Sequence, residues 1–239
     1  MNLPFEIGLP LGALAFYVYD SALLLHDDEL IFVRQGRRWH ATTGSEFVLF
    51  GKRVCLPAPL MPWCALVRST WRMTDESQAI ATMPAIATSR ALLPLKMIGT
   101  TLLALLIFAL PYASLVLKSG LLMLAVFAVY YALLFVALAY AFVRRVALGL
   151  TGRAYWTTAL DVLACPPFAV NFVRRITLRQ ELEGDALAYI RGAFEAEPRA
   201  RAFEQLRRRI DERLGAAAAD PGRAARLEKF RESLRAEGD

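Results

Sequence analysis

Two acidic side chains stand inside otherwise apolar stretches of this chain. Asp20 lies near the end of the first apolar run, and Asp161 lies within a second stretch that is rich in aromatic and aliphatic residues. An ionised carboxylate close to lipid costs about 2.5–3.5 kcal/mol on the insertion scale. Asp20 is therefore expected either at a membrane interface, beside Tyr17 and Tyr19, or facing a helix bundle. We take Asp20 and Asp161 as intramembrane acidic candidates, which could share a proton or a cation if they face each other.

A second group of polar residues follows the second apolar stretch. Residues 165–171 read CPPFAVN, and two arginines follow at Arg174 and Arg175. The two consecutive prolines interrupt any helix and free backbone carbonyls. Asn171, Arg174 and Arg175 then offer hydrogen-bond donors, so we take them as lipid-headgroup candidates. The alternative is a purely structural break between an interfacial helix and the tail that follows.

Other residue types with potential chemistry form no known pattern. His26, Asp27, Asp28 and Glu29 are adjacent possible ligands, and His40 could approach them in a hairpin. Their spacing matches no known ligand set, so we interpret them as a polar connection and assign no metal site and no cofactor.

The sequence also lacks the motifs of common catalytic sites. It contains no P-loop, no G-x-G-x-x-G, no H-E-x-x-H and no G-x-S-x-G. Three cysteines, Cys55, Cys64 and Cys165, cannot all pair and lack C-x-x-C spacing, so we expect free thiols. We lean towards a non-catalytic protein and leave the question of an enzyme open.

The element that must position these residues is a long apolar hairpin. Residues 97–117 and 119–143 carry no charge, and only Lys118 separates them. About 20 apolar residues cross a hydrocarbon core roughly 30 Å thick, so both runs predict transmembrane helices. Pro111 is expected to bend the first of them. A shorter apolar run in residues 1–25 predicts another spanning helix.

The remaining residues complete an α-helical polytopic membrane protein. It has three transmembrane helices, one interfacial or re-entrant segment, a small antiparallel β loop domain and a helical cytoplasmic tail. The predicted boundaries are a first transmembrane helix at 1–25, a β-rich cytoplasmic or interfacial loop domain at 26–96, a transmembrane hairpin at 97–143, an interfacial or re-entrant segment at 144–175, and an amphipathic helical tail at 176–239.

Charge sets the expected sidedness. The chain is 56% hydrophobic yet 21% charged, so the charges must be segregated from the apolar runs. Nine of the basic residues lie in 26–96, and residues 174–239 hold 15 basic and 13 acidic side chains. The positive-inside rule then places the N-terminus outside and the tail in the cytoplasm. Arg outnumbers Lys by 24 to 4 and Ala is abundant, which is typical of a GC-rich bacterium. We expect the bacterial inner membrane.

These features favour an assembly, scaffold or accessory subunit of a membrane complex. The expected partners are membrane lipid and a protein, or a second copy, bound through the C-terminal helices, and not nucleic acid. Two alternatives remain open. One is an oligomeric transporter-like or ion-pathway protein that uses Asp20 and Asp161, and the other is a lipid-handling membrane protein.

Overall fold

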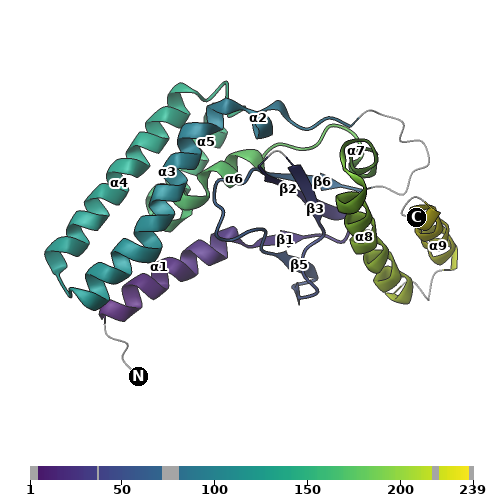
Figure 1. The fold of residues 1–239 in the computed structure, drawn as a ribbon, viewed down its shortest axis with the longest axis horizontal. Coiled ribbons are helices and arrows are strands. Elements are labelled where there is room, and N and C mark those ends of the chain that lie inside the picture. The colour runs from purple at the N-terminus through teal and green to yellow at the C-terminus, as the bar shows by residue number, and fades with distance from the viewer. Residues whose placement is uncertain (1–4, 37, 72–80, 217–220, 237–239) are drawn as a thin grey trace. The chain divides into compact units, whose positions relative to one another are not determined.

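The computed structural model describes residues 5–36, 38–71, 81–216 and 221–236. This part of the chain is mostly helical, with a small antiparallel sheet region (Figure 1). It divides into two compact units, each built from three stretches of sequence. Unit 1 comprises Met1–Ala22, Ala58–Ala65 and Ala85–Arg179, and unit 2 comprises Leu23–Pro57, Leu66–Pro84 and Gln180–Asp239.

Unit 1 is mainly helical, apart from the irregular segment Ala58–Ala65 and the turns after Val143. Its α-helices are α1 (Phe5–Ser21), α2 (Ala85–Thr88), α3 (Leu93–Ala104), α4 (Gly120–Val143), α5 (Gly152–Ala164) and α6 (Phe172–Thr177). Shorter turns connect or extend them: the 3-10 helices η1 (Arg90–Leu92) and η4 (Pro166–Asn171), and the π-helices η2 (Leu105–Ala109) and η3 (Tyr112–Val116). Pro111 lies between η2 and η3, so the departure from α-helical geometry occurs around the residue that cannot donate a backbone hydrogen bond.

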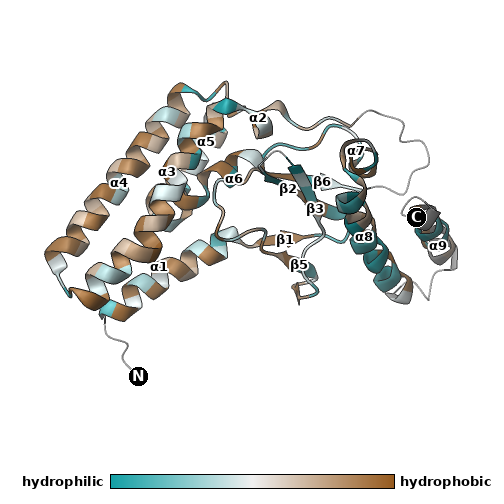
Figure 2. Ribbon diagram, in the orientation of Figure 1, coloured by the Kyte–Doolittle hydropathy of each residue, from teal (hydrophilic) through white to brown (hydrophobic). Residues whose placement is uncertain are grey.

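Two helices of the described chain are long and apolar enough to cross a membrane. They are the continuous helix Arg90–Val116, with 27 residues, and α4, with 24 residues. Lys118, with a positive φ of 46°, lies between them, and the Ser119 hydroxyl caps α4 by accepting the Leu122 N–H at 3.3 Å. Figure 2 shows hydrophobic colouring along α3 and α4. Much of the apolar surface of α4 lies outside the protein core, which is the pattern expected of a helix that faces lipid.

The first predicted span is only partly helical. The helix α1 ends at Ser21, and residues 23–25, predicted to belong to this span, form strand β1 (Leu23–Leu25) instead. They pair with a later strand, with Leu23 opposite Cys55. The described part of α1 is 17 residues long. Within the described residues, two helices have membrane-spanning length, so the predicted third span is not confirmed.

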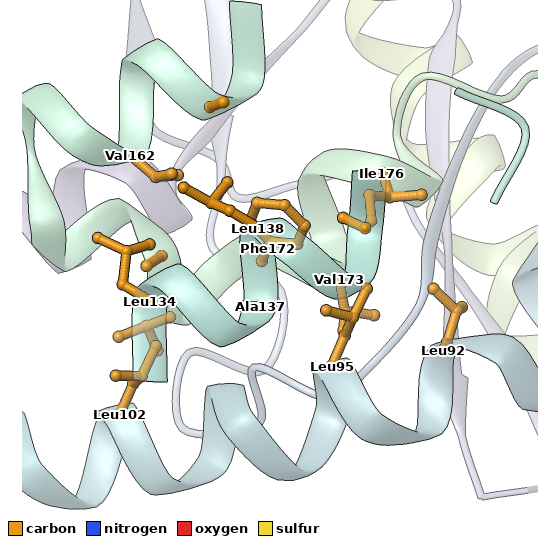
Figure 3. Close-up of a cluster of buried hydrophobic side chains, with 14 of the residues drawn as sticks. Leu92, Leu95, Leu102, Leu134, Ala137, Leu138, Val162, Phe172, Val173 and Ile176 are labelled. Carbon is orange, nitrogen blue, oxygen red and sulfur yellow. The ribbon is translucent and has the colours of Figure 1, made fainter. Parts of the chain in front are cut away.

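A buried apolar cluster joins the helices of unit 1. Ten of its side chains are labelled in Figure 3: Leu92, Leu95, Leu102, Leu134, Ala137, Leu138, Val162, Phe172, Val173 and Ile176. They come from η1, α3, α4, α5 and α6. The short helices η4 and α6 thus lie in the core of unit 1, packed against α1, α3 and α5. The break at Pro166 and Pro167 lets the chain turn into this core.

Unit 2 contains two three-stranded antiparallel sheets. One has the order β1-β5-β4, with β5 (Lys52–Cys55) in the centre and β4 (Val48–Leu49) at an edge. The other has the order β3-β2-β6, from β3 (Arg38–Thr42), β2 (Glu29–Gln35) and β6 (Leu66–Thr70). Tight turns at Gly36 and Gly51 join β2 to β3 and β4 to β5, and both glycines have positive φ values, as such turns require.

Three helices complete unit 2 and use the apolar stripes predicted for the tail. They are α7 (Ala186–Ala193), α8 (Ala196–Ala216) and α9 (Pro221–Ala236). Phe32 of the central strand β2 packs edge-on against Tyr189 and Phe194, with ring centroids 5.3 and 6.0 Å away. The Trp71 ring stacks on Phe230 of α9. The C-terminal segment therefore packs on the β3-β2-β6 sheet of the same chain.

Candidate functional site

The ionisable residues singled out from the sequence meet around one guanidinium group in unit 1. Arg175 of α6 forms an ion pair with Asp20 of α1, and its Nη1 lies 2.9 Å from Oδ2 of Asp161 on α5. The Arg175 guanidinium also lies over the Phe168 ring, 4.8 Å from its centroid. One cation thus pairs with two carboxylates that come from two other helices.

The three groups differ in their contact with solvent. The Asp20 side chain is 9% exposed, that of Arg175 is 20% exposed, and that of Asp161 is 46% exposed. Removing an ion from water costs several kcal/mol unless a partner of opposite charge and hydrogen bonds compensate. Arg175 supplies this compensation to Asp20, which is the most buried member, while Asp161 keeps access to the surface of unit 1.

Asn171 links the same carboxylate to the end of α1. Its Nδ2 donates to Oδ2 of Asp20 at 3.0 Å and to Oγ of Ser21 at 2.9 Å. The Ser21 hydroxyl in turn donates to the Tyr17 carbonyl at 2.8 Å. Asn171 and Ser21 are both buried. The last turn of α1 is therefore held against η4 by side chains, in addition to apolar packing.

Arg174 has a different role from its neighbour. It is buried, and its Nη2 donates to the carbonyls of Ala58 and of Met61, the latter at 3.0 Å. These carbonyls belong to the proline-rich segment that unit 1 includes between β5 and β6. The Tyr17 hydroxyl donates to the Pro59 carbonyl of the same segment. Arg174 and Tyr17 therefore fix this loop on the helices of unit 1.

All five residues proposed from the sequence thus lie in unit 1, but in arrangements that the sequence did not specify. Asp20 and Asp161 share Arg175, where a shared proton or a bound cation had been considered. Among the three headgroup candidates, Arg174 and Asn171 are buried against protein atoms. Only Arg175 retains exposed surface through which a lipid phosphate could approach.

The acidic cluster at the start of unit 2 pairs with arginines. Glu29 lies 3.6 Å from Arg68, and Asp27 lies 3.8 Å from Arg53, which also contacts Glu212 of α8. Among the residues that the structure describes, no group of three or more His, Cys, Asp or Glu could hold a metal ion. These ion pairs join strands and helices of unit 2.

The three cysteines are free. Cys55 and Cys64 are buried, and Cys165 is partly exposed at the end of α5. Burial raises the pKa of the Cys64 thiol, although the positive charges of Arg174 and Lys96 oppose this effect. Cys64 therefore stays a protonated thiol at neutral pH and is a poor nucleophile.

Two features were missed by the sequence reasoning. The first is an apolar cavity of about 570 Å³ in unit 1, lined by residues of α1, η2, α4 and the turn at Cys165. The glycines Gly8 and Gly12, one helical turn apart, were a signal for it. The second is the exposed apolar part of the β4–β5 hairpin, which includes Phe47 before β4 and Phe50 at the turn. The four consecutive apolar residues at 47–50 were its signal.

The chain was compared with protein-family models, with curated proteins and with solved structures, and none of the three comparisons gave a match. Its function is therefore argued from its own contacts.

Proposed function

We propose that this protein is a non-catalytic assembly or accessory subunit, anchored in the bacterial inner membrane by unit 1 and presenting unit 2 to a protein partner. In this proposal the N-terminus lies outside and the C-terminal helices lie in the cytoplasm. The apolar helices Arg90–Val116 and α4 support the membrane anchor. The basic residues of the segments 26–96 and 176–239 support this orientation in the membrane, because positively charged segments tend to stay in the cytoplasm.

The observation that carries the proposal is the set of contacts around Arg175. Its guanidinium pairs with Asp20 and Asp161, and Asn171 donates to the same Asp20. These contacts tie α1, α5 and α6 to one another, which is what a rigid anchor requires. A proton or ion pathway through Asp20 and Asp161 would first have to separate both carboxylates from Arg175, so we favour the structural role.

The partner surface that we propose is the β4–β5 hairpin. The apolar stripes of α7 and α8 are buried within unit 2, whereas Phe47, Val48, Leu49 and Phe50 are all exposed, Phe50 by 91%. Phe50 also has a positive φ of 51°, which is unusual for a bulky residue and costs on the order of 1–3 kcal/mol. An exposed, strained aromatic residue is typical of a binding site.

A protein is the occupant favoured by the surroundings of the hairpin. The strand β4 is an edge strand, which can accept an added strand from another chain. The acidic Glu46 adjoins the apolar residues, and Arg53 is engaged by Asp27 and Glu212. The guanidinium of Arg53 is therefore committed to carboxylates of unit 2 and not to anionic headgroups. In the proposed complex, α8 steadies the hairpin through the ion pair between Glu212 and Arg53.

The test is purification of the tagged full-length chain from native membranes, with quantitative mass spectrometry of the proteins that accompany it. A true partner is lost when Phe50→Ser and Phe47→Ser are combined, and it is retained in the control Leu56→Ser, which changes another exposed apolar residue of unit 2. The complex must then form again from the two purified proteins. If no protein distinguishes the variants, or if the hairpin is labelled by lipid probes, the proposal is wrong.

A further inference from the structure

Unit 1 contains a cavity whose walls are mostly apolar. It has a volume of about 570 Å³ and opens to the outside of unit 1. Its lining includes Gly8, Gly12 and Phe16 of α1, Leu106 of η2, Tyr130 of α4 and Pro166 of η4. Volumes of about 300–1,000 Å³ are typical of pockets that hold small organic ligands.

Specific residue choices keep this space open. A Cβ atom placed on Gly8 or Gly12 would meet no atom within 4 Å beyond the adjacent residues and the backbone of α1 itself, so these glycines border empty space rather than a close helix contact. At the other end, α5 stops at Ala164, and Pro166 turns the chain away. The Tyr130 hydroxyl donates to the Pro166 carbonyl at 3.1 Å and so holds this end in place. The π-helix η2 forms a further wall, and such turns are frequent at functional sites.

The walls also indicate what fills the cavity. Leu106 and Tyr130 belong to the two helices that are long and apolar enough to cross a membrane, so the medium around the opening is hydrocarbon under the proposed function. Phe16, at the lining, is itself more than half exposed. A predominantly apolar cavity gives water too few hydrogen-bond partners to occupy it stably.

One end of the cavity lies close to charge. Cys165 lines the cavity, and the Arg175 guanidinium lies over the ring of Phe168, three residues further along the chain. Arg175 retains exposed surface. A ligand with an apolar chain and a polar head would therefore find hydrocarbon-like walls along the cavity and a polar group near this end.

We infer that the cavity between α1, η2, α4 and the turn at Cys165 binds one hydrocarbon chain of a membrane lipid, with the polar head of that lipid towards Arg175. The inference rests on the proposed membrane location and not on the proposed scaffolding role. A phospholipid acyl chain, a free fatty acid and an isoprenoid chain share the required chemistry.

The first arm of the test needs no variant. The full-length protein is reconstituted in nanodiscs of phosphatidylglycerol and phosphatidylethanolamine that contain a phospholipid with a diazirine in its acyl chain, and adducts are mapped by mass spectrometry after photolysis. We expect an adduct within residues 8–16 or 164–167 that saturates at one lipid per chain. Labelling that rises without saturation and follows the exposed face of α4 overturns the inference, because it shows only surrounding bilayer lipid.

The second arm fills the cavity. Gly12→Leu should abolish the saturable adduct, whereas Gly120→Leu should leave it unchanged, because Gly120 also faces open space but does not line the cavity. Equal labelling in both variants overturns the inference. Gly8→Leu serves as the second cavity-filling variant if Gly12→Leu unfolds. Mass spectrometry of lipid extracted from the purified protein separates phospholipid, fatty acid and isoprenoid sources. A chain that purifies without detergent instead refutes the membrane location itself.

Discussion

Asn171 donates a hydrogen bond of 3.0 Å to the carboxylate of Asp20, a residue 151 positions earlier in the chain. Arg175, one helical turn after Asn171, pairs with the same carboxylate. The end of the first helix is thus tied to the segment after the double proline by one neutral and one charged contact. Both contacts involve buried or largely buried groups, so their loss should be measurable as a change in stability.

Replacing Arg175 should destabilise unit 1 strongly. Arg175→Met leaves the nearly buried Asp20 without its cation, and breaking a buried pair on one side costs about 3–5 kcal/mol. Asp20→Asn combined with Arg175→Met should recover part of this loss, because no buried charge remains. Thermal unfolding of the detergent-solubilised protein measures both effects, with the exposed Arg153→Met as control. If Arg175→Met alone is as stable as the wild-type protein, the ion pair with Asp20 does not contribute to stability.

Asp161 should matter much less than Asp20 for stability. Its side chain is 46% exposed, and exposed ion pairs contribute about 0–1 kcal/mol. Asp161→Asn should therefore lower the unfolding temperature only slightly, whereas Asp20→Asn should lower it clearly. The same thermal unfolding experiment compares them. If both substitutions have equal effects, the difference in burial does not govern this site.

Two glycines should respond to alanine in opposite ways. A Cβ on Gly99 of α3 would lie 3.0 Å from the Val170 carbonyl oxygen, so Gly99→Ala should push α3 away from η4 and cost about 1–3 kcal/mol. Gly12 faces open space inside α1, so Gly12→Ala should stabilise the helix by about 0.5–1 kcal/mol. The test compares the denaturant concentration at the midpoint of unfolding for the two variants and the wild-type protein in detergent. Destabilisation of equal size in both would contradict the close approach at Gly99.

Two phenylalanines of unit 2 should differ in how much they contribute to stability. Phe32 is fully buried between Tyr189 and Phe194, and Phe→Ala in a core costs about 3–5 kcal/mol. Phe50 is 91% exposed, so Phe50→Ala should leave stability almost unchanged, because alanine loses no buried contact and keeps the same positive φ. Limited proteolysis of the full-length protein detects the loss of unit 2. A destabilising Phe50→Ala would mean that the hairpin tip is packed within the chain.

The Cys64 thiol should react slowly with alkylating reagents. It is buried, and burial raises its pKa, so the reactive thiolate is scarcer at pH 8 than for a free cysteine. We expect slow labelling by N-ethylmaleimide in the folded protein and fast labelling in dodecyl sulfate, with peptide mass spectrometry as the readout. Rapid labelling of Cys64 under native conditions would contradict its burial.

The sequence predicted local features well because they depend on neighbouring residues. The uncharged runs on both sides of Lys118 indicated two long helices, and the double proline at Pro166 indicated the end of α5. The β-rich stretch after residue 26 indicated the small antiparallel sheets. Asp20 and Asp161 were recognisable as candidates because a charge in an apolar stretch needs a partner.

The features that depend on distant residues were beyond the sequence pattern. Nothing near Arg175 shows that both carboxylates reach it, because the pairing is set by how α1, α5 and α6 pack. Three consecutive leucines at 23–25 fit a helix as well as a strand, and only pairing with β5 decides between them. The stripes of α7 and α8 signalled a packed face without identifying the sheet that covers it.

The interleaved order of the two units has a practical consequence. Unit 2 is made of three stretches that are separated in the sequence by parts of unit 1: Leu23–Pro57, Leu66–Pro84 and Gln180–Asp239. No single cut in the gene can release the sheet together with the helices that cover Phe32, so expression of a truncated soluble fragment should yield misfolded or aggregating material. Biochemical reconstitution of this protein has to begin with the intact polypeptide.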